Sequence, residues 1–221
     1  DLDRVAFGLA CGARMMAWHG ATLGGFSGST EGAAIVATAG AFQSLLVNFG
    51  HQIAISITPF RVRSRATRQG LWAESIALQA LSRNTHLVLE GANGDHPAAG
   101  PGTRQYFYEA AAGFIEVVAS GGHQAAGTRK FVIGNTPNYG TPLESRWMGE
   151  ICKSSAGMSR KQANEIVRYL LDKYEPTLKE APDGFTYEHL FDVTTDQPRP
   201  EYLALYNETR AELKALGLPL P

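Results

Sequence analysis

One short stretch of this sequence gathers the side-chain types that acid–base chemistry needs. Residues 90–96 hold a glutamate, an asparagine, an aspartate and a histidine around two glycines: Glu90, Asn93, Asp95, His96, Gly91 and Gly94. A carboxylate beside an imidazole can act as general acid and base near neutral pH. Glycine, asparagine and aspartate are also common turn residues, so a solvated loop with an Asx turn at Asp95 explains the same composition. We predict Glu90, Asp95 and His96 as catalytic residues and Asn93 as a substrate-binding residue.

A run of four arginines lies upstream of this cluster: Arg61, Arg63, Arg65 and Arg68. Guanidinium groups bind carboxylates through paired hydrogen bonds, so the run could hold a carboxylate or an anionic partner surface. A charge run is also typical of a hydrated helix flank. Arg61 follows a predicted strand most closely, and we predict it as a substrate-binding residue.

Other catalytic signatures are missing from the sequence. The six histidines form no close pair at metal-ligand spacing and no cysteine accompanies them, so we predict no metal site. The sequence has neither a G-x-S-x-G elbow nor a Walker loop, which argues against serine hydrolases and P-loop NTPases.

Strand and helix patterns alternate through the first 140 residues, and these elements must position the candidates. Apolar runs predict strands at 13–19, 52–58, 86–90 and 130–134. Helical spacing predicts helices at 31–49, 67–82 and 103–120. Ser29 or Thr30 can cap the first of these helices, whose large apolar side chains include Ile35, Phe42 and Leu46.

The pattern changes near residue 143. Consecutive helices are predicted at 143–155 and 159–175, the second opened by a capping box of Ser159 and Gln162, and a last helix at 201–216. We therefore expect βα units over residues 1–142 and a helical extension of the same domain over 143–221.

About four βα units make half of an eight-stranded TIM barrel, so the predicted fold class is α/β. A small open sheet of the flavodoxin type is the alternative, but it would carry a tighter glycine fingerprint than the cluster at residues 24–28. In a barrel, reactive groups gather at the carboxyl ends of strands. That rule selects residues 18–19, 58–61, 90–96 and 134–138, and it adds Trp18 and His19 to the substrate-binding candidates.

Composition excludes several classes of protein. The chain is 44% hydrophobic and 19% charged, with a formal net charge of −1, so a dedicated nucleic-acid binder is not expected. No run of about eighteen apolar residues predicts a membrane span, and no signal peptide is evident. Two distant cysteines, Cys11 and Cys152, favour a reducing cytoplasm.

A set of distributed matches carries a family resemblance. They fall at residues 23–26, 67–68, 97–101, 143–150 (LESRWMGE), 156–157, 174–175, 181–184 (APDG), 191–193, 201–202, 206 and 216–218. In these residues the sequence resembles the monomethylamine:corrinoid methyltransferases. The resemblance covers nearly the whole chain colinearly, although no single short motif is diagnostic.

The resemblance implies the carboxyl-terminal half of a β/α barrel. It also implies methyl transfer from a small methylated amine to the cobalt of a corrinoid (cobalamin), which a cognate corrinoid protein carries. Members of the family are cytoplasmic homo-oligomers of methanogenesis and related metabolism. Their pyrrolysine belongs to an amino-terminal barrel half that would lie upstream of Asp1 and is missing from this chain.

Two departures from the family concern the candidate site. Gly94 and His96 stand where the family has a glutamine and a tyrosine, in a longer loop, and no acid stands beside Trp18 and His19 at the position of a family carboxylate. We therefore expect His96 and Glu90 to replace the family's polar pair in holding substrate. There are two alternatives: methyl transfer from another N-methyl compound, and a non-catalytic half-barrel with a structural or docking role.

Overall fold

A sheet of four parallel strands runs through the computed structural model, which describes residues 2–130 and 140–221. The strands are β1 (Met16–Leu23), β2 (Gln52–Pro59), β3 (Val88–Gly91) and β4 (Gln124–Ala125), and they lie side by side in chain order. A parallel sheet in which neighbours are consecutive needs a crossover after each strand. The predicted alternation of strand and helix is thus confirmed.

The crossovers are the helices α2 (Thr30–Asn48), α3 (Arg68–Asn84) and α4 (Arg104–Ala119). Each begins after a residue whose side-chain oxygen accepts a hydrogen bond from the backbone of the first turn, namely Ser29, Thr67 and Thr103. Such caps satisfy amide groups that a helix cannot pair internally. They therefore fix where each crossover starts.

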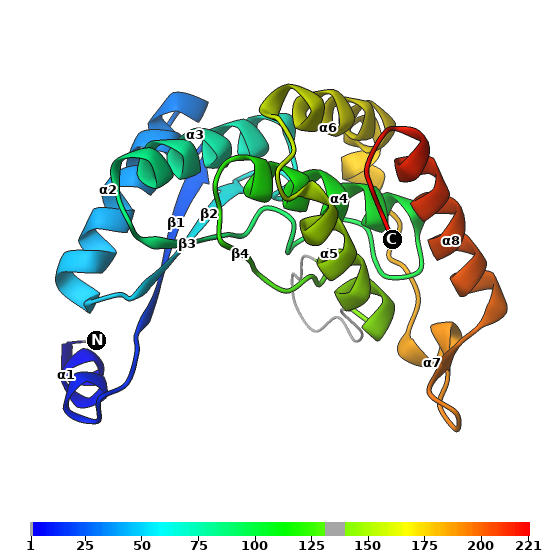
Figure 1. Ribbon diagram of the computed structural model, residues 1–221, viewed down its shortest axis with the longest axis horizontal. Helices are drawn as coiled ribbons and strands as arrows, with labels where there is room; N and C mark the ends of the chain where they lie inside the picture. Colours follow the sequence, from blue (N-terminus) through cyan, green and yellow to red (C-terminus); the bar gives the residue numbers. More distant parts are fainter. Residues whose placement is uncertain (1, 131–139) are drawn as a thin grey trace.

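The elements form an arch, with α2 and α3 over one face of the sheet and the other face turned to the open side (Figure 1). Alternation along β2 produces this division, because successive side chains of a strand point to opposite faces. Ile53, Ile55 and Ile57 are fully buried and share one hydrophobic core with α2 and α3. Ala54 and Ser56 belong to the opposite face, which we call the inner face.

Helix α2 packs in a different orientation from the one that its large apolar residues predict. Its buried face consists of small residues such as Ala33, Ala37 and Gly40, whereas Ile35 and Leu46 are exposed. Small side chains let the helix approach the sheet closely. By length and composition alone α2 could cross a membrane, but it packs against β1, β2 and α3 as a barrel helix does.

Two strands differ from their predicted positions. The first runs to Leu23, so Trp18 and His19 lie inside β1 rather than at its carboxyl end. The fourth is the short pair Gln124–Ala125, upstream of the predicted strand at 130–134. Residues 131–139, which hold nearly all of that predicted strand and the candidate strand end at 134–138, lie outside the described residues.

The carboxyl-terminal part adds three long helices: α5 (Pro142–Ser155), α6 (Arg160–Tyr174) and α8 (Pro200–Ala215). All three share a second hydrophobic core with α4, in which the ring of Phe107 contacts those of Trp147 and Tyr206. The capping box of Ser159 and Gln162 is confirmed at the start of α6. Shorter elements complete the chain: α1 (Leu2–Ala10), η1 (Glu175–Glu180), α7 (Tyr187–Leu190), β5 (Phe191–Asp192) and β6 (Gln197–Pro198).

Candidate active site

Polar side chains cross the inner face of the sheet at one level. Trp18 pairs with Ala54 in the β1–β2 register, and Ala54 pairs with Glu90 in the β2–β3 register. In-register neighbours of a parallel sheet point to the same side, so Trp18 and Glu90 flank the small side chain of Ala54. Two strand spacings separate their backbones by about 9–10 Å.

The side-chain amide of Gln52 contacts the carboxylate of Glu90. The Nε2 group of Gln52 donates a hydrogen bond to Glu90 and lies 3.1 Å from Oε1 of Gln124, so three strands are joined by side chains on the inner face. Burial raises the pKa of Glu90, the hydrogen bond from Gln52 opposes this effect, and the nearby charge of Asp95 adds to it. Glu90 is thus a nearly buried carboxyl group within the strand, not part of the following loop.

Arg65 contacts side chains of β1, of β2 and of the loop after β3. Its Nη1 atom donates to Oδ1 and Oδ2 of Asp95 at 2.8 Å and 2.9 Å, and its Nε donates to Oγ1 of Thr58 at 3.1 Å. The guanidinium carbon lies 5.6 Å from the centre of the Trp18 ring, within the range of a cation–π contact. The indole of Trp18 in turn donates to Oγ of Ser56 at 3.1 Å.

His96 is held from both sides of its ring. Nδ1 lies 2.6 Å from Oδ1 of Asp95, and Nε of Arg129 donates to Nε2 at 3.2 Å. Because a guanidinium can only donate, Nε2 accepts this hydrogen bond, and Nδ1 is the ring nitrogen on the side of Asp95. The Arg129 amide also donates to the carbonyl of Asp95 at 2.8 Å, which fixes the backbone of this segment. Asp95 and His96 thus form an oriented carboxylate–imidazole pair.

The side chain of Asn93 accepts a hydrogen bond from the backbone through its oxygen, while its NH₂ group makes none to the described residues. Its Oδ1 accepts from the amide of Ile57 at 3.4 Å, which ties the loop to β2. Its Nδ2 is buried and has no hydrogen-bond partner among the described residues. An unsatisfied buried amide is costly, so a polar group outside these residues would be stabilised there.

Two buried glutamates of the outer helices hold the loop at its two ends. Glu74 accepts from the amides of Ala92 and Asn93 at 2.9 Å and 3.1 Å. Glu109 accepts from the amides of Ala98 and Ala99 at 2.7 Å and 3.1 Å. Burial raises the pKa of both carboxyls, and the amide hydrogen bonds favour their charged forms.

The glycines of this loop allow close packing against a helix and do not adopt unusual backbone angles. Neither Gly91 nor Gly94 has a left-handed φ. A Cβ at Gly94 would lie 2.5 Å from the ring of Phe114, and a Cβ at Gly91 would lie 2.4 Å from Val117. Close packing of the loop on α4 therefore requires both.

The structure brings together Trp18, Glu90, Asp95 and His96, with Asn93 at the base of the loop, and leaves two other candidates apart. His19 points to the opposite face of β1, where its ring occupies the space that a Cβ of Gly40 would need. Arg61 is exposed and forms no ion pair within the described part of the chain, and Arg65 makes the carboxylate contact instead.

Several site residues escaped the sequence reasoning. Arg129 follows β4, whose short length hides it from pattern analysis. Gln52 could have been found, because it alternates with Ala54 and Ser56 and so shares their face. The glutamates at 109 and 116 stand seven residues apart in an otherwise apolar helix, which is a signal of buried carboxyls. Among residues 2–130 and 140–221, no group of three or more histidines, cysteines or acids is placed to hold a metal ion.

Known proteins resemble this chain in sequence and in structure. The family model described as "Monomethylamine methyltransferase MtmB" matches residues 3–218. Monomethylamine methyltransferase MtmB2 of Methanosarcina acetivorans is 31% identical over 195 residues, which are 88% of this chain and 42% of that protein. MtmB1 of Methanosarcina barkeri is 32% identical over the same shares.

Solved structures give the same relationship. The crystal structure of the Methanosarcina barkeri monomethylamine methyltransferase superposes with a TM-score of 0.92 at 28% identity, over 98% of this chain and 47% of that one. The hydroxylamine complex of MtmB superposes with a TM-score of 0.91. This chain therefore spans less than half the length of the relatives that it matches.

Proposed function

Because this chain belongs to the monomethylamine methyltransferase MtmB family, we propose that it takes part in methyl transfer from a small methylated amine to a corrinoid held by a cognate partner protein. Its four parallel strands and helices form the carboxyl-terminal half of a (β/α)8 barrel with extra carboxyl-terminal helices. We further propose that the remaining strands come from an amino-terminal half and that the complete protein is a cytoplasmic homo-oligomer. Free thiols at Cys11 and Cys152 are consistent with a reducing compartment.

The observation that carries the proposal is the inner-face arrangement of Trp18, Ala54 and Glu90. Ala54, whose side chain is a single methyl group, separates an aromatic ring from a carboxyl group at one level of the sheet. A methylammonium ion has an apolar methyl end and an N–H end. The carboxylate can accept the N–H groups, and the indole face can receive the methyl group or attract the cation.

The pair of Asp95 and His96 is the second support. Nδ1 of His96 lies 2.6 Å from Oδ1 of Asp95 and Nε2 accepts from Arg129, so the imidazole keeps one orientation after the carboxyl end of β3. In methyl transfer the C–N bond breaks, and the nitrogen keeps the bonding electron pair as a neutral amine departs. We assign to Glu90 the binding of the amine nitrogen. Asp95 and His96 would keep the bound amine protonated, so that it leaves as a neutral molecule when the C–N bond breaks.

The corrinoid cobalt would supply the electron pair that takes the methyl group. Gly20 has no side chain and Thr22 is exposed, so the inner face toward the carboxyl end of β1 is open to a bulky group. No described residue has to serve as its ligand, because the partner protein carries it. This chain would hold the amine, orient the methyl group outward and exclude water beside Trp18.

A methyl-transfer assay tests the proposal. The protein, with the segment that completes its barrel, is mixed with cob(I)alamin and with methylamine, dimethylamine, trimethylamine or a panel of other N-methyl compounds. Conversion is followed in the cobalt spectrum. Turnover with one methylated amine supports the proposal and identifies the substrate. Turnover only with another N-methyl compound changes the substrate class, and no turnover with any of them favours a structural half-barrel.

A further inference from the structure

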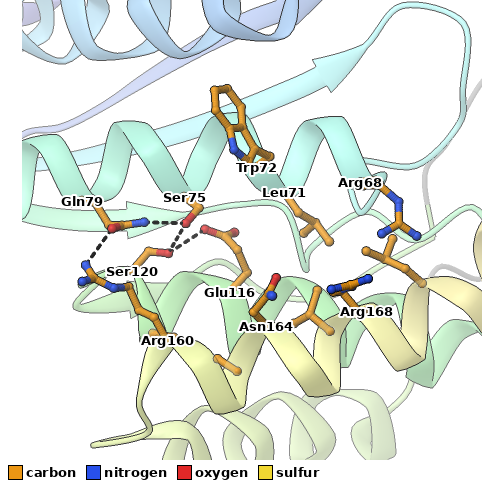
Figure 2. Close-up of a pocket in the computed structure, with 14 residues that line it drawn as sticks. Arg68, Leu71, Trp72, Ser75, Gln79, Glu116, Ser120, Arg160, Asn164 and Arg168 are labelled. Carbon is orange, nitrogen blue, oxygen red and sulfur yellow. Dashed lines mark hydrogen bonds between the residues drawn. The ribbon is translucent and has the colours of Figure 1, made fainter.

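A pocket of about 310 Å³ lies between α3, α4 and α6, on the outer side of the helix layer. Figure 2 shows α3 and α6 as its two walls, with Glu116 and Ser120 of α4 at its floor. The inner-face candidates do not line it, and the proposed methyl transfer does not use it. Its volume suits a small organic molecule.

The floor of the pocket holds a buried carboxyl that can stay uncharged. Glu116 accepts a hydrogen bond from Oγ of Ser120 at 3.1 Å, lies against Glu74 and is buried, as Glu74 is. Both oxygens of Glu74 already accept from backbone amides, so Glu74 is the better place for the negative charge. Two adjacent buried carboxyls do not both ionise easily, so Glu116 keeps the shared proton. The floor therefore does not repel an anion.

Three arginines stand around this floor: Arg68, Arg160 and Arg168. Arg68 is paired with Asp172 and Glu175, and Arg160 donates to Oε1 of Gln79. Arg168 has no ion pair or hydrogen bond within the described residues, and it lies near Arg68 and Asn164 in Figure 2. One guanidinium at the pocket thus remains available to a ligand.

Apolar side chains line much of the two walls of the pocket. Leu71 and Trp72 come from α3, and Val167 and Leu171 come from α6. Leu71 and Leu171 are almost fully buried, while 46% of the Trp72 side chain is exposed beside the pocket. An apolar body can be buried here, and the indole offers a signal for its presence.

We propose that this pocket is a second binding site, which takes a small organic anion whose carboxylate pairs with Arg168 and whose apolar body packs on Leu71, Trp72 and Val167. An aliphatic carboxylate of about six carbons is the chemistry that fits: one anionic end for the unpaired guanidinium, and a short chain for the apolar walls.

Titration of the protein with hexanoate tests the site, with calorimetry and Trp72 fluorescence as readouts. We expect a Kd of about 1 mM or tighter, a range typical of so small a ligand. Hexan-1-ol and hexylammonium serve as matched probes without the negative charge. Both should bind at least about tenfold more weakly than hexanoate. The fluorescence change should disappear in Trp72→Phe while the calorimetric signal remains.

Arg168→Met and Lys161→Met form a matched pair of variants. Both residues are exposed positions of α6, but Lys161 does not line the pocket. We expect Arg168→Met to weaken hexanoate binding at least about tenfold and Lys161→Met to leave it unchanged. Far-ultraviolet circular dichroism confirms that both variants are folded.

Three outcomes overturn the proposal. The first is the absence of hexanoate binding up to about 10 mM, where a ligand of this size should be seen. The second is equal binding to Arg168→Met and to the unchanged protein. The third is equal binding of hexanoate and hexan-1-ol, which would mean that the pocket takes any apolar chain and does not select an anion.

Discussion

Arg65 and Asp95 form an ion pair across 30 residues of sequence, with Nη1 at 2.8 Å and 2.9 Å from the two carboxylate oxygens. Only 12% and 4% of the two side chains are exposed. The pair joins the segment after β2 to the loop after β3. It therefore sets the position of Trp18 and His96 relative to each other.

Replacing Arg65 should destabilise the protein strongly. Arg65→Met leaves the Asp95 carboxylate buried without its cation, which costs about 3–5 kcal/mol of the free energy of unfolding. Urea denaturation measures the loss. Arg61→Met is the control, because Arg61 is exposed, and it should change the free energy by no more than about 0.5 kcal/mol. If both variants change the free energy of unfolding equally, the ion pair between Arg65 and Asp95 does not stabilise the protein.

His96 is expected to matter for methyl transfer more than for folding. His96→Ala removes the imidazole between Asp95 and Arg129, and the rate of transfer should fall about 100-fold or more if the pair does acid–base work. His86→Ala removes an exposed imidazole and should leave the rate unchanged. An unchanged transfer rate in His96→Ala would contradict the assignment of His96.

The free energy of unfolding should fall with rising pH, because Glu116 loses a proton that stabilises the folded state. Burial beside Glu74 raises the pKa of Glu116 well above its ordinary value of 4.5. The unfolded chain loses this proton first, so the folded state binds more protons and the free energy of unfolding falls as pH rises through that window. For one proton the slope reaches about 1.4 kcal/mol per pH unit.

Glu116→Gln should flatten this dependence, since an amide can donate to Glu74 at every pH. The groups that face Glu116 are Glu74 and Ser120, and the charge of Asp95 acts on Glu74. Glu74→Gln has the same shape but sets an NH₂ group against the amides of Ala92 and Asn93. It should cost about 1–3 kcal/mol at all pH values. Urea denaturation of both variants at several pH values gives the test. If the free energy of unfolding depends on pH in the same way in both variants, the proton does not reside on Glu116.

Gly113 should resist substitution because α4 touches the backbone of the site loop there. A Cβ at Gly113 would lie 2.3 Å from the amide nitrogen of Gly94, which cannot move without shifting the loop. Gly113→Ala should destabilise the protein by about 1–3 kcal/mol. Gly149→Ala in α5 meets nothing within 4 Å and should stabilise by up to about 1 kcal/mol. Thermal unfolding compares the two, and equal stability changes would count against the close approach.

This 221-residue chain alone should not remain a monomer. β1 is a sheet edge and carries Met16 and Trp18, which are 52% and 44% exposed. An exposed parallel edge favours pairing with another chain. Light scattering after size-exclusion chromatography should show association, and addition of an amino-terminal barrel half should replace it. A monodisperse monomer that unfolds cooperatively would speak against this expectation.

Local signals were sufficient for most of the fold. Apolar alternation identified β2, and the caps at Ser29 and Ser159 marked helix starts, because their hydrogen bonds lie within three residues of sequence. The short β4 was missed, since two residues carry no readable period. The side of α2 that faces the sheet was also predicted wrongly. Its contacts with the sheet favour small side chains, and apolar spacing alone does not reveal them.

The site divides in the same way. The sequence by itself singled out Glu90, Asp95 and His96, because acids and an imidazole within seven residues are a composition that can be read directly. Only the tertiary structure selected Arg65 over Arg61 and separated Trp18 from His19. The first choice depends on a loop that returns to Asp95 across 30 residues. The second depends on where β1 begins and on which of its faces meets α2. Short-range hydrogen bonds determine elements, whereas the partner of a charged side chain is determined by the path of the whole chain.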